Sequence, residues 1–158
     1  MGTGKSEVGK LLAQRLQREF FDTDTVIEQV TGQLIARIFA EKGEAHFREL
    51  EKQVIRQVCR KHELVIATGG GAIVNMDNAI CLQESGTVIC LTASPETIVQ
   101  RVQGNRDRPL LQGEDPLTKI RSLLTARAEA YARADITIDT SSLNPSEVVE
   151  MILAQIML

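Results

Sequence analysis

The sequence predicts an α/β sandwich, in which helices cover both faces of a mostly parallel sheet. Two observations support this. Short apolar runs that suit buried strands alternate with helical segments through the whole chain. The composition, 43% hydrophobic and 25% charged, is that of an ordinary globular protein. At 158 residues we expect a single domain over residues 1–158.

The first third of the chain predicts one strand among helices. Apolar residues recur at helical spacing from Val8, which predicts a helix over residues 5–19. Phe20 and Phe21 then form a short strand that ends at Asp22. Further helices are predicted over residues 25–31, 34–41 and 44–61, with breaks at Gly32 and Gly43.

The remaining sequence predicts three strands and four helices. Leu64–Ala67 is a short apolar run closed by three glycines, which favours a buried strand, and residues 87–92 and 135–139 predict two more. Helices are expected over residues 77–84, 95–102, 116–133 and 145–158, with Pro95 and Pro145 in first turns. Residues 103–115 are polar, contain glycine and proline, and interrupt this alternation, so they are a candidate lid.

Composition excludes several classes of function. The net charge is −3 and aromatic residues make up 3% of the chain, so neither a basic field nor stacking platforms exist for nucleic acid. No segment has the ~20 apolar residues of a membrane span, and no signal peptide is evident. Three widely spaced cysteines indicate reduced thiols in a cytoplasmic protein, and two distant histidines do not suggest a zinc site.

A phosphate-binding motif opens the chain. Gly4, Lys5 and Ser6 match the end of the pattern GxxxxGK[ST], with Gly2 just before them. In such loops backbone N–H groups and a helix N-terminus bind phosphate, the lysine neutralises the β- and γ-phosphates, and the hydroxyl ligates Mg²⁺. The first glycine of the pattern and its preceding strand would lie upstream of Met1. Taken alone, the short match is equally compatible with a turn before a helix.

Two carboxylates and a glycine run follow strands, where ligands bind in parallel sheets. Asp22 and Asp24 alternate along an extended segment and can face one side, one to hold Mg²⁺ and the other to accept a proton. The alternative is a helix cap at Asp24 or Thr25, with Asp22 in solvent. Residues 69–71 are all glycine, which lets a ligand approach the backbone, or makes a flexible turn.

Three arginines complete the candidate site. Arg48, Arg108 and Arg127 are well separated in the sequence, and each is a potential bidentate partner for carboxylate or phosphate. For any one of them alone, a solvated surface charge is the alternative.

Together these motifs resemble the shikimate kinase family. They occur in family order and spacing from Met1 to the final helix: Gly-Thr-Gly-Lys-Ser at residues 2–6, Phe-Asp-Thr-Asp at 21–24, Gly-Glu-x-x-Phe-Arg-x-x-Glu at 43–51, Ala-Thr-Gly-Gly-Gly at 67–71, Arg-Pro-Leu-Leu at 108–111, and Arg127 with Tyr131. The resemblance implies a P-loop, nucleoside-monophosphate-kinase-like fold with strand order 2-3-1-4-5, the first strand being absent from this sequence. It also implies transfer of the γ-phosphate of ATP to the 3-hydroxyl of shikimate.

The resemblance also implies a set of residue roles. Lys5, Asp24 and Arg108 would be catalytic, Asp24 as the base. Ser6 and Asp22 would hold Mg²⁺. ATP would contact Gly2, Gly4, Lys5, Ser6, Arg101, Arg108 and Pro145, and shikimate would contact Asp24, Arg48, Gly69, Gly70, Gly71 and Arg127. Glu51 would orient Arg48. The lid would span residues 103–115, the substrate-binding helical segment residues 25–61, and the molecule would be a monomer.

Two departures from the family pattern affect the nucleotide end. Glu7 stands where a hydroxyl residue is common, and Leu143 where a basic residue can occur. Two alternative functions remain at this stage. One is a gluconate-kinase-like enzyme, which the pair Arg48 and Arg127 disfavours. The other is a non-catalytic nucleotide-binding relative, which the incomplete phosphate loop favours.

Overall fold

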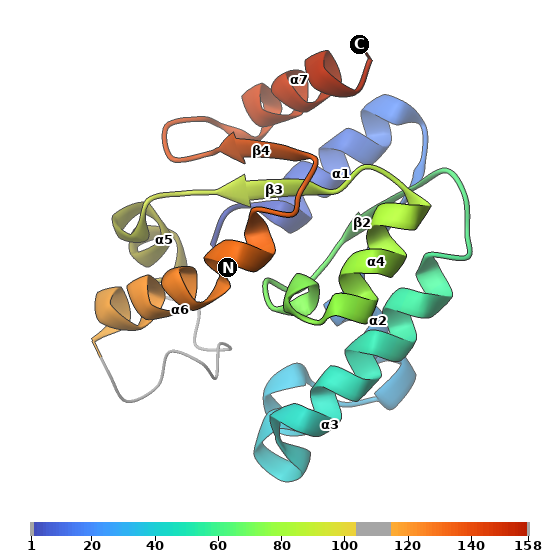
Figure 1. The fold of residues 1–158 in the computed structure, drawn as a ribbon, viewed down its shortest axis with the longest axis vertical. Coiled ribbons are helices and arrows are strands. Elements are labelled where there is room, and N and C mark those ends of the chain that lie inside the picture. Colours follow the sequence, from blue (N-terminus) through green and yellow to red (C-terminus); the bar gives the residue numbers. More distant parts are fainter. Residues whose placement is uncertain (1, 104–114, 158) are drawn as a thin grey trace.

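The computed structural model describes residues 2–103 and 115–157 (Figure 1). Strands and helices alternate as predicted. In chain order they are α1 (Lys5–Leu16), β1 (Glu19–Asp22), α2 (Thr23–Thr31), α3 (Ile35–Val58), β2 (Leu64–Ala67), the 3₁₀ turn η1 (Ala72–Val74), α4 (Met76–Ser85), β3 (Ile89–Thr92), α5 (Pro95–Val102), α6 (Pro116–Tyr131), β4 (Ile136–Asp139) and α7 (Pro145–Ile156).

The sheet consists of two parallel pairs. Strand β1 pairs with β2 from Glu19 opposite Leu64, and β3 pairs with β4 from Ile89 opposite Ile136. Among the described residues no strand joins β2 to β3. The predicted parallel α/β fold is confirmed, and the two pairs have the order expected when the first of five strands is absent. The sheet is nevertheless discontinuous at its centre.

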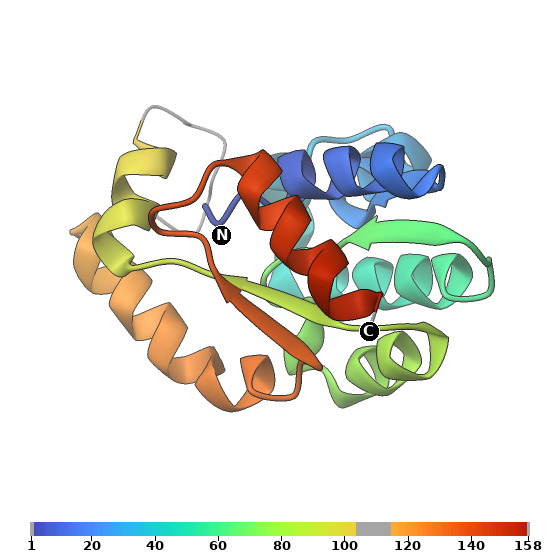
Figure 2. The same cartoon turned by 90° about the horizontal axis from the view of Figure 1, so that it is seen from above.

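Helices lie on both faces of these strands. Figure 2 shows α1 and α7 on one face and α4 and α6 on the other. The first layer is fixed by an aliphatic core in which Val8 and Leu12 of α1 pack with Ile138 of β4 and with Val148 and Ile152 of α7. The predicted aliphatic sandwich is therefore present, with its main core between α1, α7 and the second strand pair.

The helical segment after β1 contains a break at Gly43. Residues 34–41 and 44–61 were expected to form two helices, and they lie within one span, α3, that is interrupted by non-helical backbone at Gly43. Gly43 has φ 82°, a left-handed conformation that glycine adopts without steric cost. Ile38 and Phe47, on either side of the break, pack into one core with Ile27 of α2. The bend thus folds the segment back on itself beside β1 and β2.

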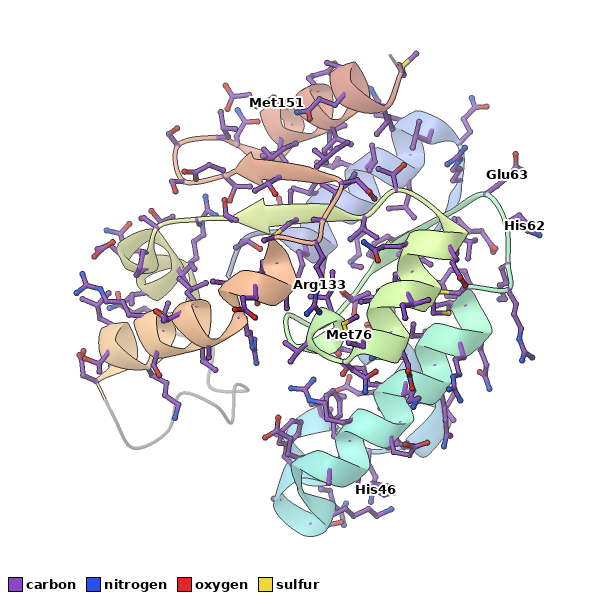
Figure 3. The ribbon with its side chains drawn as sticks, viewed as in Figure 1. His46, His62, Glu63, Met76, Arg133 and Met151 are labelled. Carbon is purple, nitrogen blue, oxygen red and sulfur yellow. The ribbon has the colours of Figure 1, made fainter. Side chains whose placement is uncertain are left out.

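Pro95 and Pro145 lie in first helical turns, as the sequence indicated. Pro95 and Pro145 occupy the first turns of α5 and α7, behind the side-chain caps Ser94 and Asn144. Figure 3 shows His46 on α3 far from His62 in the loop that follows it. Within the described ranges, no three His, Cys, Asp or Glu side chains gather as metal ligands, and no helix has the length and apolarity to span a bilayer.

Candidate active site

The predicted site residues that the structure describes lie together in one cleft at the carboxyl ends of β1 and β2. Its volume is about 790 Å³. The starts of α1 and α2 and the turn after β2 line it, and α3 and α6 contribute charged side chains. It is lined by every predicted site residue that the structure describes: Gly2, Gly4, Lys5, Ser6, Asp22, Asp24, Arg48, Gly69, Gly70, Gly71, Arg101, Arg127 and Pro145. Arg108 and residues 104–114 of the predicted lid lie outside the described residues.

The start of α1 forms an anion-binding end of the cleft. Gly2 and Gly4 have φ 67° and 85°, so the loop turns through left-handed conformations into the helix. Gly4 is the N-cap of α1 and supplies no side-chain cap for the first N–H groups of the helix. Such N–H groups and the positive helix end favour a phosphate, and Lys5 in the first turn adds a charge beside them.

Ser6 and Asp22 form a pair of oxygen ligands next to this loop. The Ser6 hydroxyl donates to Asp22 Oδ2 at 2.6 Å, and Asp22 Oδ1 accepts from the backbone N–H groups of Asp24 and Thr25. Asp22 thus caps α2 with one oxygen and presents the other to Ser6. Mg²⁺ prefers a few hard oxygen ligands and keeps waters and phosphate oxygens as its remaining partners. The residues present fit such an ion.

Asp24 lies in the cleft through helical geometry. The expectation that Asp22 and Asp24 alternate along a strand was wrong, because Asp24 is in the first turn of α2. The alternative of Asp22 as a solvated residue was wrong too, since Asp22 is the helix cap. Burial, with the charge of Asp22, raises the pKa of Asp24 above the usual carboxyl range, against the opposing charge of Lys5. Its Oδ1 is buried without a hydrogen-bond partner in the described chain. The hydroxyl group of a ligand can donate a hydrogen bond to this oxygen.

Arg48 is fixed by two glutamates from its own helix. Its Nη1 donates to Glu51 Oε2 at 2.8 Å and its Nη2 to Glu44 Oε1 at 3.1 Å. Burial alone would lower the pKa of Arg48, but these bonds outweigh burial and raise it. Glu51 is only 1% exposed, and its burial raises its own pKa in spite of the Arg48 charge. The expectation that Glu51 orients Arg48 agrees with this ion pair.

The three glycines after β2 leave room for these side chains. A methyl group on Gly69 would lie 2.9 Å from Glu51 Oε1 and 3.3 Å from Asp24 Oδ1, and one on Gly71 would lie 2.6 Å from Arg48 Nη2. Contacts below about 3.0 Å force movement of one partner. The glycines therefore allow α2 and α3 to bring their charged groups against the backbone at residues 69–71.

Helix α6 supplies the opposite wall. The Tyr131 hydroxyl donates to the Gly70 carbonyl at 2.8 Å, which ties α6 to the glycine turn. Arg127, one turn earlier, lines the cleft and has no hydrogen bond or ion pair within the described residues. Its charge acts on Glu51. Arg127 is therefore available to an anionic ligand on the side facing Arg48.

Arg101 has a structural role that sequence reasoning missed. Its guanidinium donates to the Thr140 carbonyl at 2.6 Å and hydroxyl at 2.9 Å, and more weakly to the Gly2 carbonyl at 3.4 Å. It therefore fastens α5 to the loop after β4 and to the start of the chain. Pro145, at the start of α7, lines the same end of the cleft.

An aromatic wall was also missed. Phe39 and Phe47 both line the cleft, with ring centroids 4.7 Å apart, and the Phe47 ring lies 5.2 Å from the Arg48 guanidinium carbon. Arginine above a ring face is a favourable arrangement. The sequence gives no sign of the Phe39–Phe47 contact, because the two rings lie on opposite sides of the break at Gly43.

Comparisons with known proteins agree on one family. The family model described as shikimate kinase matches residues 1–157. A curated shikimate kinase of Thermodesulfovibrio yellowstonii is 44% identical over 155 residues, covering 98% of this chain and 90% of the relative. A solved shikimate kinase of Acinetobacter baumannii, in complex with shikimate, has a TM-score of 0.96 at 40% identity, covering 99% of this chain and 88% of that one. The solved shikimate kinase of Aquifex aeolicus has a TM-score of 0.86 at 35% identity, and the match covers 99% of this chain and 92% of that one.

Proposed function

This chain belongs to the shikimate kinase family of ATP-dependent kinases, and from that premise we propose that it transfers the γ-phosphate of ATP to the 3-hydroxyl of shikimate. The products are shikimate 3-phosphate and ADP. One observation supports the assignment to particular residues: a single cleft is lined by the phosphate loop and by the arginine pair Arg48 and Arg127. A neutral acceptor would have no use for that pair.

The acceptor end would bind shikimate through Arg48, Arg127 and Asp24. Shikimate carries one carboxylate, and the two arginines face the cleft from α3 and α6 as a clamp for it. The hydroxyls would reach Asp24, whose buried Oδ1 lacks a partner within the described residues. Backbone groups of Gly69, Gly70 and Gly71 would contact the ring at close range.

The nucleotide end would bind ATP at the start of α1. The N–H groups of residues 2–6 and the Lys5 ammonium would hold the β- and γ-phosphates, with Arg101 and Pro145 near the adenine. Ser6 and Asp22 would hold Mg²⁺, which supplies charge neutralisation for the phosphates. Arg108, from the predicted lid over residues 103–115, would close onto the transferred group.

The reaction would proceed by in-line transfer. The 3-hydroxyl oxygen of shikimate forms a bond to the γ-phosphorus while the bond from that phosphorus to the bridging oxygen breaks, and ADP leaves with the electron pair. The hydroxyl proton passes to Asp24, which lies beside Lys5 and Asp22. Lys5 offsets the charge that develops on the phosphate oxygens.

We also propose that the protein acts as a monomer in the cytoplasm. Both ends of the cleft come from one chain, so no second subunit is needed to complete the described part of the site. The three cysteines are free thiols, which suits a reducing compartment where ATP is also available.

An assay of ADP release tests this function. The purified chain is given MgATP with and without shikimate, and then with gluconate as an alternative acceptor. We expect release that depends on shikimate and not on gluconate. Release that is independent of shikimate, or that follows gluconate, would contradict the proposed acceptor. Product identification as a 3-phosphate by ³¹P and ¹H NMR checks the position of transfer.

A further inference from the structure

Glu51 is a buried carboxylate with one partner in the described chain. Its side chain is 1% exposed and lies one helical turn after Arg48 on α3. One of its oxygens, Oε2, accepts a hydrogen bond from Arg48 Nη1 at 2.8 Å. The other, Oε1, is buried without a hydrogen-bond partner among the described residues. A buried charge is costly unless it is paired and fully hydrogen-bonded, so the charge of Glu51 is only partly compensated in the empty cleft.

The unpaired oxygen of Glu51 lies against the glycine turn that lines the cleft. A methyl group on Gly69 would be 2.9 Å from this Oε1 and 3.3 Å from Asp24 Oδ1. The charged groups that act on Glu51 come from three helices: Asp24 of α2, Arg48 of α3 and Arg127 of α6. Burial is the largest influence and raises the pKa of Glu51 above the usual carboxyl range, although both arginines oppose it. The ionised form of Glu51 therefore depends on the charge of the arginines.

Arg48 is already shared between two carboxylates. Besides its bond to Glu51, it donates to Glu44 Oε1 from Nε at 3.3 Å and from Nη2 at 3.1 Å. An acceptor carboxylate held by Arg48 and Arg127 would be a third anion at this guanidinium, and Asp24 adds a further negative charge nearby. Each added anion raises the free energy of the ionised form of the others. We therefore expect one of these carboxylates to take up a proton when the acceptor binds.

Solvent exposure distinguishes the two glutamates that share Arg48. The Glu44 side chain is 57% exposed, so water stabilises its charge whatever else binds to the guanidinium. The Glu51 side chain has no such access to water, and Arg48 is the contact that offsets its burial. When an acceptor carboxylate neutralises part of the Arg48 charge, the ionised form of Glu51 loses that stabilisation. Of the two glutamates, Glu51 is thus the one that becomes protonated.

We propose that Glu51 takes up one proton from solvent when the carboxylate of the acceptor binds to Arg48 and Arg127, so that the acceptor replaces Glu51 as the counter-ion of Arg48. The proton bonds to Oε1, the oxygen without a partner, and no other covalent bond changes. A neutral glutamic acid still accepts from Arg48 through Oε2 and gains an O–H that can donate to the ligand. This inference rests on the proposed function for the identity of the acceptor. It makes Glu51 a positioning residue whose charge responds to the carboxylate of the acceptor.

Calorimetric titration in buffers of different ionisation enthalpy counts the protons taken up for each ligand bound. The first ligand is shikimate. The second is cyclohex-1-enecarboxylate, which keeps only the ring and the carboxylate, and the third is the neutral cyclohex-1-enecarboxamide. The titrations run from about pH 5 to about pH 8, since buried glutamates can titrate across this range. Nucleotide and Mg²⁺ are left out, so turnover does not contribute to the heat.

Two variants identify the group that takes up the proton. Glu51→Gln keeps an oxygen that can accept from Arg48 but cannot be protonated in this pH range. The matched control is Glu49→Gln, at an exposed glutamate of the same helix whose side chain accepts from Gln53 Nε2 at 3.3 Å. A purely structural role of Glu51 would change the Kd for shikimate without changing the proton count. The three ligands on the unsubstituted chain test the proposal even without a variant.

We expect uptake of up to about one proton per shikimate, between the pKa of Glu51 in the empty cleft and its higher pKa in the complex. Because binding takes up a proton, the Kd for shikimate should rise across this window by up to about tenfold per pH unit, and should level off on both sides of it. Cyclohex-1-enecarboxylate should take up the same fraction of a proton, and the carboxamide none. Glu51→Gln should abolish both the uptake and the pH dependence, whereas Glu49→Gln should preserve them.

Three results would overturn the proposal. They are uptake that persists in Glu51→Gln, binding of either carboxylate without uptake, and equal uptake with the carboxamide. A chain that binds cyclohex-1-enecarboxylate with uptake dependent on Glu51, but does not bind shikimate, would contradict the proposed acceptor and support the role of Glu51. A folded chain that binds neither carboxylate would overturn both.

Discussion

The two ends of the active-site cleft are built in different ways. At the acceptor end, charged side chains are held by one another and by the backbone, as in the Arg48–Glu51 ion pair and the Tyr131–Gly70 hydrogen bond. At the nucleotide end, the loop of Gly2 and Gly4 offers backbone N–H groups, and the first turn of α1 has no side-chain cap. The difference indicates that the acceptor end is ordered before ligands bind, whereas the nucleotide end depends on phosphate and metal.

Removal of Mg²⁺ should give the largest difference between the two ends, because it should affect turnover far more than shikimate binding. Chelation of Mg²⁺ should lower turnover more than about 1,000-fold, since a metal ion supplies several kcal/mol of charge stabilisation in phosphoryl transfer. The Kd for shikimate, measured by calorimetry without nucleotide, should change less than about twofold, because neither Ser6 nor Asp22 belongs to the acceptor end. A large loss of shikimate affinity on chelation would contradict the separation of the two ends.

Substitution of the proposed base should reduce turnover without loss of the fold. Asp24→Asn should lower kcat by about 100-fold or more, because an amide cannot accept the proton of the acceptor hydroxyl as a carboxylate does. Burial and Asp22 raise the pKa of Asp24, so its charged form is disfavoured in the folded chain, and its contribution to stability is lost as pH rises through that pKa. The variant should therefore unfold at pH 7 at the same temperature or a higher one.

A matched aspartate serves as the control for that result. Asp77 is exposed, and a side-chain hydrogen bond from Lys52 lowers its pKa. Asp77→Asn should leave kcat unchanged and should lower stability only slightly, because the ion pair with Lys52 is exposed to solvent. Near-normal turnover in Asp24→Asn would remove Asp24 from the role of base.

The two arginines of the acceptor end should differ in their effect on stability. Arg48→Ala and Arg127→Ala should each raise the KM for shikimate about 10- to 100-fold, as expected for loss of a charge-assisted bond to a carboxylate. Arg48→Ala should also destabilise the protein by about 2 kcal/mol, because Glu51 keeps a buried carboxylate without its partner. Arg127→Ala should leave the unfolding midpoint in urea nearly unchanged. Equal loss of stability in both variants would contradict the asymmetry.

The smallest effect is expected at Tyr131. Tyr131→Phe removes one hydrogen bond, from the hydroxyl to the Gly70 carbonyl, and should cost about 1 kcal/mol of stability. The KM for shikimate should rise only a few-fold, because the glycine turn loses one support and keeps its contacts with Glu51 and Arg48. The KM for ATP should not change, and a change there would show that the two ends are coupled through α6.

The sequence could predict the elements and most of the site, because local patterns determine them. The period of the apolar residues predicted α1, the short apolar run closed by glycines predicted β2, and the prolines marked the first turns of α5 and α7. The motifs named most of the residues that line the cleft with a proposed role, and the family resemblance added Arg101 and Pro145. The helical placement of Asp24 was missed, because an aspartate such as Asp22 can either extend a strand or cap a helix, and here it caps α2.

Longer-range features could not be predicted. No local sequence pattern encodes contacts between residues that only the folded backbone brings together. Examples are the approach of Glu51 to Gly69, the ring contact of Phe39 with Phe47, and the hydrogen bond from Arg101 to Thr140. The apolar runs of β2 and β3 predicted buried strands, yet most of their residues are only half-buried in the structure.

The claim that the acceptor end is formed in advance is tested most directly by titrating shikimate into the chain by calorimetry, with neither nucleotide nor magnesium present. We predict saturable binding of one shikimate per chain, which Arg127→Ala weakens by about 10-fold or more while the chain remains folded by circular dichroism. A folded chain that binds shikimate only after nucleotide is added would contradict it, and would place the ordering of the acceptor end after that of the nucleotide end.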